Sequence, residues 1–117
     1  MNGGFDPLST VKEILILHLL RQHVDADLGR IRALSLHLGQ AYIDRLEAFH
    51  AGLLKRIGEA KRLLGRHGVR VIQQEKNSLD FQITYVERGY EVRHCFLLAT
   101  LYAECQERFL QDFWGGR

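Results

Sequence analysis

The stretch SLHLGQAYIDRLEAFHAGLLKRIGEAKRLLGRHG, residues 35 to 68, contains no proline and carries apolar side chains at helical spacing. The stripe begins just upstream and continues in steps of three or four residues through Ile31, Leu34, Leu38, Tyr42, Leu46, Phe49, Leu53, Ile57, Ala60 and Leu64. This period is typical of an amphipathic helix. We predict a long central helix over about residues 28–67, ended by Gly65 and Gly68.

The length of this helix constrains the rest of the fold. A helix of about 38 residues is roughly 57 Å long, whereas a compact chain of this size has a radius of gyration of only about 13 Å. One straight helix would therefore leave apolar residues in water. Either the helix breaks, with Gly39 as the candidate position, or a second chain covers the excess, or both are true.

The flanking sequence predicts an α+β fold. Thr10 to Glu13 has the form of a capping box, and the helix expected over about residues 11–26 is apolar on nearly all sides, so it belongs in the centre of the molecule. After Val69 the period changes to two, which predicts strands over about residues 69–76, 80–88 and 90–96. They form a three-stranded antiparallel meander covered on one face, with a hairpin turn at Arg88-Gly89.

Helical spacing returns over about residues 97–114, which predicts a C-terminal amphipathic helix. The chain has 117 residues, a length that favours one domain. We expect a flexible N-terminal segment at residues 1–10 and a single α+β domain at residues 11–114. Its expected order is a buried helix, the long and kinked or unbroken helix, the meander and the final helix.

The sequence favours a cytoplasmic protein with no membrane partner. The N-terminus lacks the pattern of a signal peptide, and the apolar run Ile14 to Leu20 is too short to span a bilayer. Cys95 and Cys105 lie ten residues apart, which matches no metal or redox motif, so we expect two reduced thiols.

No catalytic, metal or cofactor motif stands out, so we expect no enzyme and no cofactor. His18 and His23 are five residues apart and point to different sides of a helix, whereas ligand pairs need three or four. His94 and Cys95 point to opposite faces of a strand, which excludes a nucleophile pair between them. His94 is interpreted as a hydrogen-bonded core histidine, with a pH-sensitive buried group as the alternative.

Positive charge is concentrated in one block. The chain has a net charge of +2, whereas residues 55–70 contain six Lys or Arg and one Glu. Such a block suits a helix C-terminus, but it also suits contacts with phosphates. The candidate phosphate-binding residues are Lys55, Lys61, Arg62, Arg66 and Arg70.

Two functional hypotheses follow. The first is a small non-catalytic interaction or regulatory protein that acts as a homodimer, with a candidate interface on the long helix at Tyr42, Leu46, Phe49, Leu53 and Ile57. The second starts from a break at Gly39, after which the order of elements over residues 11–113 resembles that of winged-helix DNA-binding proteins. Two features oppose it: the recognition helix would be too long for a groove, and Asp44 and Glu47 would repel phosphates.

Overall fold

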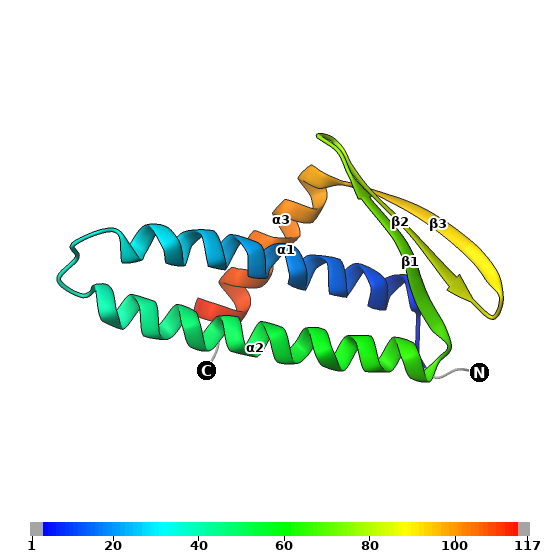
Figure 1. The fold of residues 1–117 in the computed structure, drawn as a ribbon, viewed down its shortest axis with the longest axis horizontal. Helices are drawn as coiled ribbons and strands as arrows, with labels where there is room; N and C mark the ends of the chain where they lie inside the picture. Colours follow the sequence, from blue (N-terminus) through cyan, green and yellow to red (C-terminus); the bar gives the residue numbers. More distant parts are fainter. Residues whose placement is uncertain (1–3, 115–117) are drawn as a thin grey trace.

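The computed structural model describes residues 4–114 and has the predicted α+β architecture (Figure 1). Two helices, a three-stranded antiparallel sheet and a third helix follow one another along the chain. A short π-helical segment continues the last helix. The elements are α1 (Pro7–Arg32), α2 (Gly39–Arg66), β1 (Val69–Lys76), β2 (Asp80–Glu87), β3 (Tyr90–Leu97), α3 (Leu98–Phe109) and η1 (Leu110–Trp114).

The long apolar stripe is divided between two antiparallel helices, so of the alternatives left open by the sequence the structure has the break, next to Gly39. The predicted boundaries need correction, because α1 continues to Arg32 and α2 begins only at Gly39. Asp25, Asp27 and Gly29, residue types that often cap or end a helix, lie inside α1. Leu28 is buried and Ile31 half-buried there, and their packing outweighs the weak helix propensity of the residues around them.

The first helix also begins earlier than predicted. Asp6 is its N-cap and accepts a hydrogen bond from the Leu8 amide at 3.2 Å, while Pro7 occupies the first helical turn. Thr10 is already inside the helix, since its amide bonds to the Asp6 carbonyl at 3.0 Å. The flexible segment predicted for residues 1–10 is therefore wrong from Asp6 onward, and residues 1–3 lie outside the described residues.

The all-round apolar character of α1 places it in the centre of the molecule, as predicted. The helix contacts α2 along its length, α3 crosses it, and Leu15, Leu19 and Phe81 line one space between it and the sheet. Its fully buried side chains include Val11 and Leu17, each 1% exposed. The core is thus built around α1 rather than between the strands.

The sheet is the predicted meander, in the order β1-β2-β3. Arg88 and Gly89 have φ angles of 53° and 81°, the left-handed pair that a two-residue hairpin turn needs. The inner face carries Phe81, Ile83 and Tyr85 of β2, which are buried. Their partners on β3, Phe96, His94 and Val92, share that face but are only half-buried. One face of the sheet is covered, and least completely at β3.

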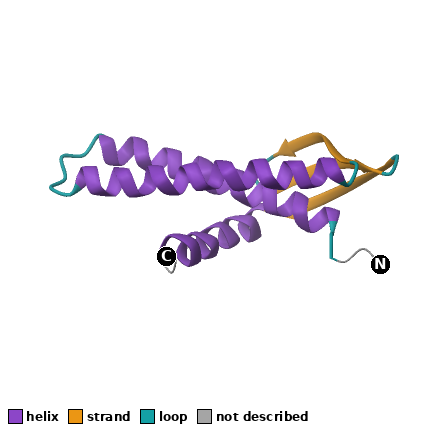
Figure 2. Ribbon diagram, turned by 90° about the horizontal axis from the view of Figure 1, so that it is seen from below, coloured by secondary structure: helices purple, strands orange, loops and turns teal. Residues whose placement is uncertain are grey.

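Charged and aromatic contacts hold α3 and η1 against the helical hairpin. Arg108 donates to both oxygens of Glu13, and Arg56 joins Glu13 to Asp112 at 3.3 and 2.7 Å. The centroid of the Phe49 ring lies 5.3 Å from that of the Phe109 ring and 5.5 Å from that of the Phe113 ring. These contacts lie near the middle of the hairpin, which α3 crosses obliquely (Figure 2).

The molecule is elongated, with principal extents of 54 × 32 × 20 Å. Its radius of gyration is 16.3 Å, compared with about 13 Å for a compact chain of this length. The sheet covers one end of the hairpin, and the connection between α1 and α2 projects at the other end (Figures 1 and 2). The projecting end carries a group of neighbouring exposed apolar residues.

Candidate functional site

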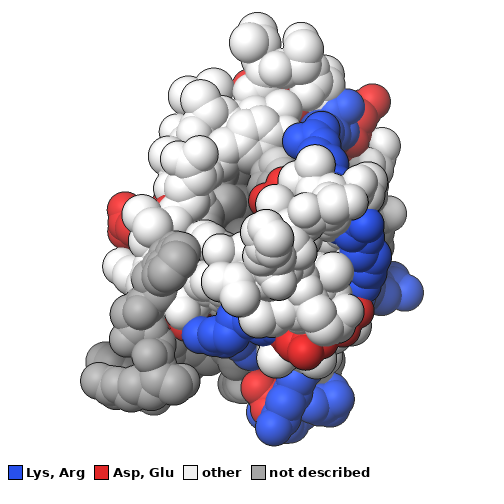
Figure 3. Space-filling model, turned by 90° about the vertical axis from the view of Figure 1, so that its left-hand side faces the viewer, with Lys and Arg blue, Asp and Glu red and all other residues white. Residues whose placement is uncertain are grey.

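The projecting end of the hairpin exposes four large apolar side chains, which we call the apolar end. Leu34, Leu36 and Leu38 lie in the connection between the helices, and Tyr42 lies on the first turn of α2. Leu38 is 63% exposed and Leu34 58% exposed. Figure 3 views the molecule from this side, and most of the surface facing the viewer carries no charged side chain. Exposed apolar groups gathered in this way are typical of a protein contact surface.

A groove of about 550 Å³ lies between the hairpin and α3. Its walls are mainly apolar, and Tyr42 of the apolar end lies one helical turn from Leu46 in the groove wall. Leu110, at the other wall, is 59% exposed. The lining residues from α1 are Leu20, His23, Val24 and Asp27; those from the other elements are Leu46, Tyr102, Cys105, Gln106, Phe109 and Leu110.

The sequence did not predict this surface, because Leu34 and Leu38 fit the apolar stripe and were expected to be covered. A signal was present in LSLHL, residues 34–38, where leucines recur every second residue. Spacing of two places successive side chains on different sides of a helix, so it does not fit one buried helical face. The structure places these residues outside both helices.

The predicted dimer interface is mostly taken up by the chain's own core. Leu46, Leu53 and Ile57 are buried against the rest of the chain, and Leu53 is only 1% exposed. Phe49 is half-buried against Phe109 and Phe113. Tyr42 alone remains accessible, at 50%. Of this set, Leu46, Leu53 and Ile57 are thus covered within one chain, and Tyr42 is the member left most exposed to a second chain.

The five candidate phosphate-binding residues are exposed. Lys55, Arg62 and Arg66 lie on the outer side of α2, with Lys61 next to Arg62 and Arg70 on β1. Within residues 4–114, none of the five takes part in an ion pair, whereas the neighbouring Arg56 forms ion pairs with Glu13 and Asp112. The stripe of cations exists, but it lies on a 28-residue helix antiparallel to its neighbour. A helix-turn-helix instead joins two helices at a steep angle.

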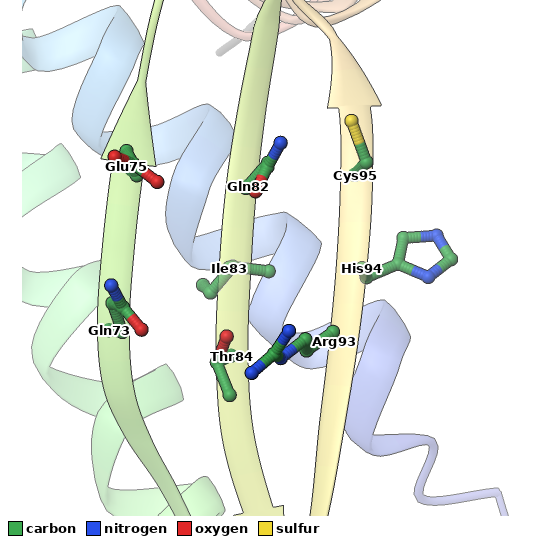
Figure 4. A pocket seen from close by; sticks show the side chains of 8 residues that line it. All are labelled: Gln73, Glu75, Gln82, Ile83, Thr84, Arg93, His94 and Cys95. Atoms are coloured by element: carbon green, nitrogen blue, oxygen red, sulfur yellow. The ribbon is translucent and has the colours of Figure 1, made fainter.

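The outer face of the sheet is polar and forms a shallow hollow of about 310 Å³. Gln73, Glu75, Gln82, Thr84, Arg93 and Cys95 lie on this face (Figure 4). His94 points past the edge of β3 and away from the Cys95 thiol, as the strand alternation predicts. Desolvation and the nearby Asp80 raise the pKa of the Cys95 thiol. This pair is therefore not arranged as a nucleophile and base.

His94 differs from the expected hydrogen-bonded core histidine. It is half-buried, and its ring lies against the Phe96 ring at a centroid distance of 4.8 Å. No hydrogen bond joins it to another group in the described part of the chain. It thus lies at a free sheet edge rather than in the core.

Among residues 4–114, no group of three or more His, Cys, Asp or Glu side chains is placed to hold a metal ion. No helix in that range is long and apolar enough to cross a membrane.

Comparison with known proteins supplies one match. No curated protein and no solved structure matches the chain. A family model described as "YhjD protein" matches residues 5–115, which include every helix and strand described above. The chain therefore belongs to the YhjD protein family.

Proposed function

We propose that this protein is a non-catalytic interaction protein of the cytoplasm, which acts as a homodimer and presents its apolar end to another protein. The observation that carries the proposal is the apolar end itself: Leu34, Leu36, Leu38 and Tyr42 lie at the tip of the hairpin, in a stretch (residues 34–42) that contains no Asp, Glu, Lys or Arg. Exposed apolar side chains of this size gain free energy when another chain covers them.

The total surface of the chain supports a second contact. Its solvent-accessible area is 7935 Å² for a mass of 13.5 kDa, whereas a compact monomer of that mass exposes about 6,500 Å². The excess exceeds the area of about 800 Å² that one partner buries in a standard interface. This supports an assembly in which the chain is covered at more than one place.

The surroundings of the cysteines support the other two parts of the proposal, the non-catalytic role and the cytoplasmic location. The Cys95 thiol and the His94 ring point apart, which favours a non-catalytic role. Cys95 and Cys105 are both free, as expected in a reducing compartment.

The test has two measurements. Light scattering on the purified protein is expected to give twice the chain mass of 13.5 kDa at micromolar concentration. A photo-crosslinking amino acid placed at Leu38 is then expected to form one defined adduct in cells that naturally make the protein. Leu79, which is 71% exposed in the turn between β1 and β2, is the control position and should form none. A monomeric mass overturns the homodimer, and equal adducts at both positions overturn the role of the apolar end.

Nucleic-acid binding is the second candidate, favoured by the five exposed cations Lys55, Lys61, Arg62, Arg66 and Arg70, which have no ion-pair partner within residues 4–114. Cations of this kind would give binding that weakens steeply with salt. Fluorescence anisotropy with duplex DNA at low and moderate salt tests it. Absence of binding at low salt excludes this candidate.

A further inference from the structure

The geometry points to the outer edge of β3 as the place where two copies of this chain join, by antiparallel pairing of β3 with β3 into a six-stranded sheet. This inference rests on the proposed homodimer and names its interface. It is carried by three features of β3: an open edge, an incompletely covered inner face, and charges that complement themselves.

The edge of β3 is open and regular. Its register with β2 runs without interruption from Asp80 opposite Leu97 to Glu87 opposite Tyr90. The strand sequence YEVRHCFL has no proline, glycine or lysine, the residues that commonly block an edge. The opposite edge, β1, is interrupted by a bulge between Val71 and Gln73 and ends in Glu75 and Lys76. A bulge and an edge lysine discourage pairing, so β3 is the edge better suited to a further strand.

The ladder also fixes which backbone groups are available. Tyr90 and Glu87 flank the two-residue turn at Arg88-Gly89, so their backbone groups bond to each other. Because hydrogen-bonded pairs alternate along an antiparallel ladder, the N–H and C=O groups of Glu91, Arg93 and Cys95 point away from β2. A second strand can use these groups.

The inner face of the sheet is less completely covered at β3 than at β2. Tyr85 and Ile83 on β2 are buried, whereas Val92 and His94 directly opposite them on β3 are only half-buried. Tyr90, at the start of the strand, is 77% exposed. Another strand beside β3 would extend this apolar row and cover these side chains.

The charges of β3 favour a second copy of the same strand as the partner, and they favour one register of the pairing. A two-fold axis at Val92 places Glu91 of each copy opposite Arg93 of the other, and Tyr90 opposite His94. Both charged side chains are exposed and already lie 3.6 Å apart within one strand. An axis at Arg93 would instead oppose two arginines, and an axis at His94 would oppose Glu91 with Leu97. Opposite charges across a strand pair are favourable and like charges unfavourable, so the axis at Val92 is preferred.

Charge reversal tests this register sharply. Glu91→Arg alone and Arg93→Glu alone each place like charges across the axis, and each is expected to weaken the dimer by about tenfold or more. An equimolar mixture of the two variants restores opposite charges in both pairs, so it should form a heterodimer. The double variant E91R/R93E should dimerise like the wild type for the same reason. Glu75→Arg, the same charge change on the outer face of β1, is the matched control and should leave the dimer unchanged.

Sedimentation velocity over a concentration series measures the wild type and all five test and control samples. Circular dichroism checks that each variant is folded, and the recovery in the mixture shows that neither single variant lost dimerisation through misfolding. A wild-type monomer overturns the proposed homodimer and this interface with it. A wild-type dimer that E91R leaves intact, or a mixture that stays monomeric, overturns the β3 interface alone.

Discussion

Arg108 of α3 donates to both carboxylate oxygens of Glu13 on α1, with its two terminal nitrogens at 2.6 and 2.9 Å. The two residues are 95 positions apart in sequence. The Glu13 hydrogen bond raises the pKa of Arg108 most strongly, and burial opposes that effect. Since Arg56 also reaches Glu13, one carboxylate joins α1, α2 and α3.

Glu13→Gln should therefore destabilise the fold. It leaves two partly buried guanidinium groups without their shared carboxylate, which we expect to lower the free energy of unfolding by about 1–3 kcal/mol. Urea denaturation measures the change. Glu104→Gln is the control, because within the described residues Glu104 pairs with one cation, Lys12, and the loss of that single pair should change stability by less than about 1 kcal/mol. Equal effects of the two variants would contradict the central role of Glu13.

The stripe residues should separate into core and surface by mutation. Leu53→Ala creates a cavity at a side chain that is 1% exposed, and it is expected to cost about 2–5 kcal/mol. Leu38→Ser changes a side chain that is 63% exposed, and its effect should stay within about 0.5 kcal/mol. Thermal denaturation of the two variants checks this. A mild Leu53→Ala would mean that the intrachain core is not packed as described.

Stability should fall in mild acid partly because of His18. Burial lowers the pKa of His18 below its ordinary value of 6.5, and the charges of Lys61 and Arg21 lower it further. The unfolded state therefore takes up this proton as the pH falls through 6.5, and the folded state takes it up only at a lower pH. This contribution to stability is complete above that pH and is lost below it. The loss in unfolding free energy from about pH 7.5 to about pH 5 should be smaller in His18→Gln than in the wild type.

The two cysteines should differ strongly in reactivity. Cys95 is exposed, whereas Cys105 is buried, its thiol donates to the Ile16 carbonyl at 3.6 Å, and burial raises its pKa to about 11. A thiol reagent at neutral pH should modify Cys95 in the folded protein and Cys105 only after unfolding. In a Cys95→Ser variant the folded protein should hardly react. Rapid modification of that variant would show that the environment of Cys105 opens readily.

The sequence predicted correctly those elements whose structure depends on residues close together in the chain. The alternation in FQITYVE and the Arg88-Gly89 turn gave β2, β3 and their connection, because strand faces and left-handed turns are properties of neighbouring residues. The all-apolar α1 indicated a central position for the same reason, since a helix with no polar side must be covered on all sides.

The errors concern contacts between distant segments. Leu46 and Leu53 were assigned to a second chain because nothing in their own neighbourhood reveals that α1 and α3 cover them. The packing of Phe49 against Phe109 and Phe113 joins residues some sixty positions apart. The apolar end was missed for the opposite reason: Leu34 and Leu38 fit the helical periodicity, and only the fold leaves them uncovered.

The long axis of 54 Å separates the free edge of β3 from the tip of the helical hairpin (Figure 1). Occupation of one of these surfaces therefore leaves the other accessible. Two chains joined at the sheet would make a bivalent assembly, with one leucine-rich tip from each chain. A ligand that carries two matching sites would then bind its second tip at a high local concentration, and weak individual contacts would add up to tight attachment.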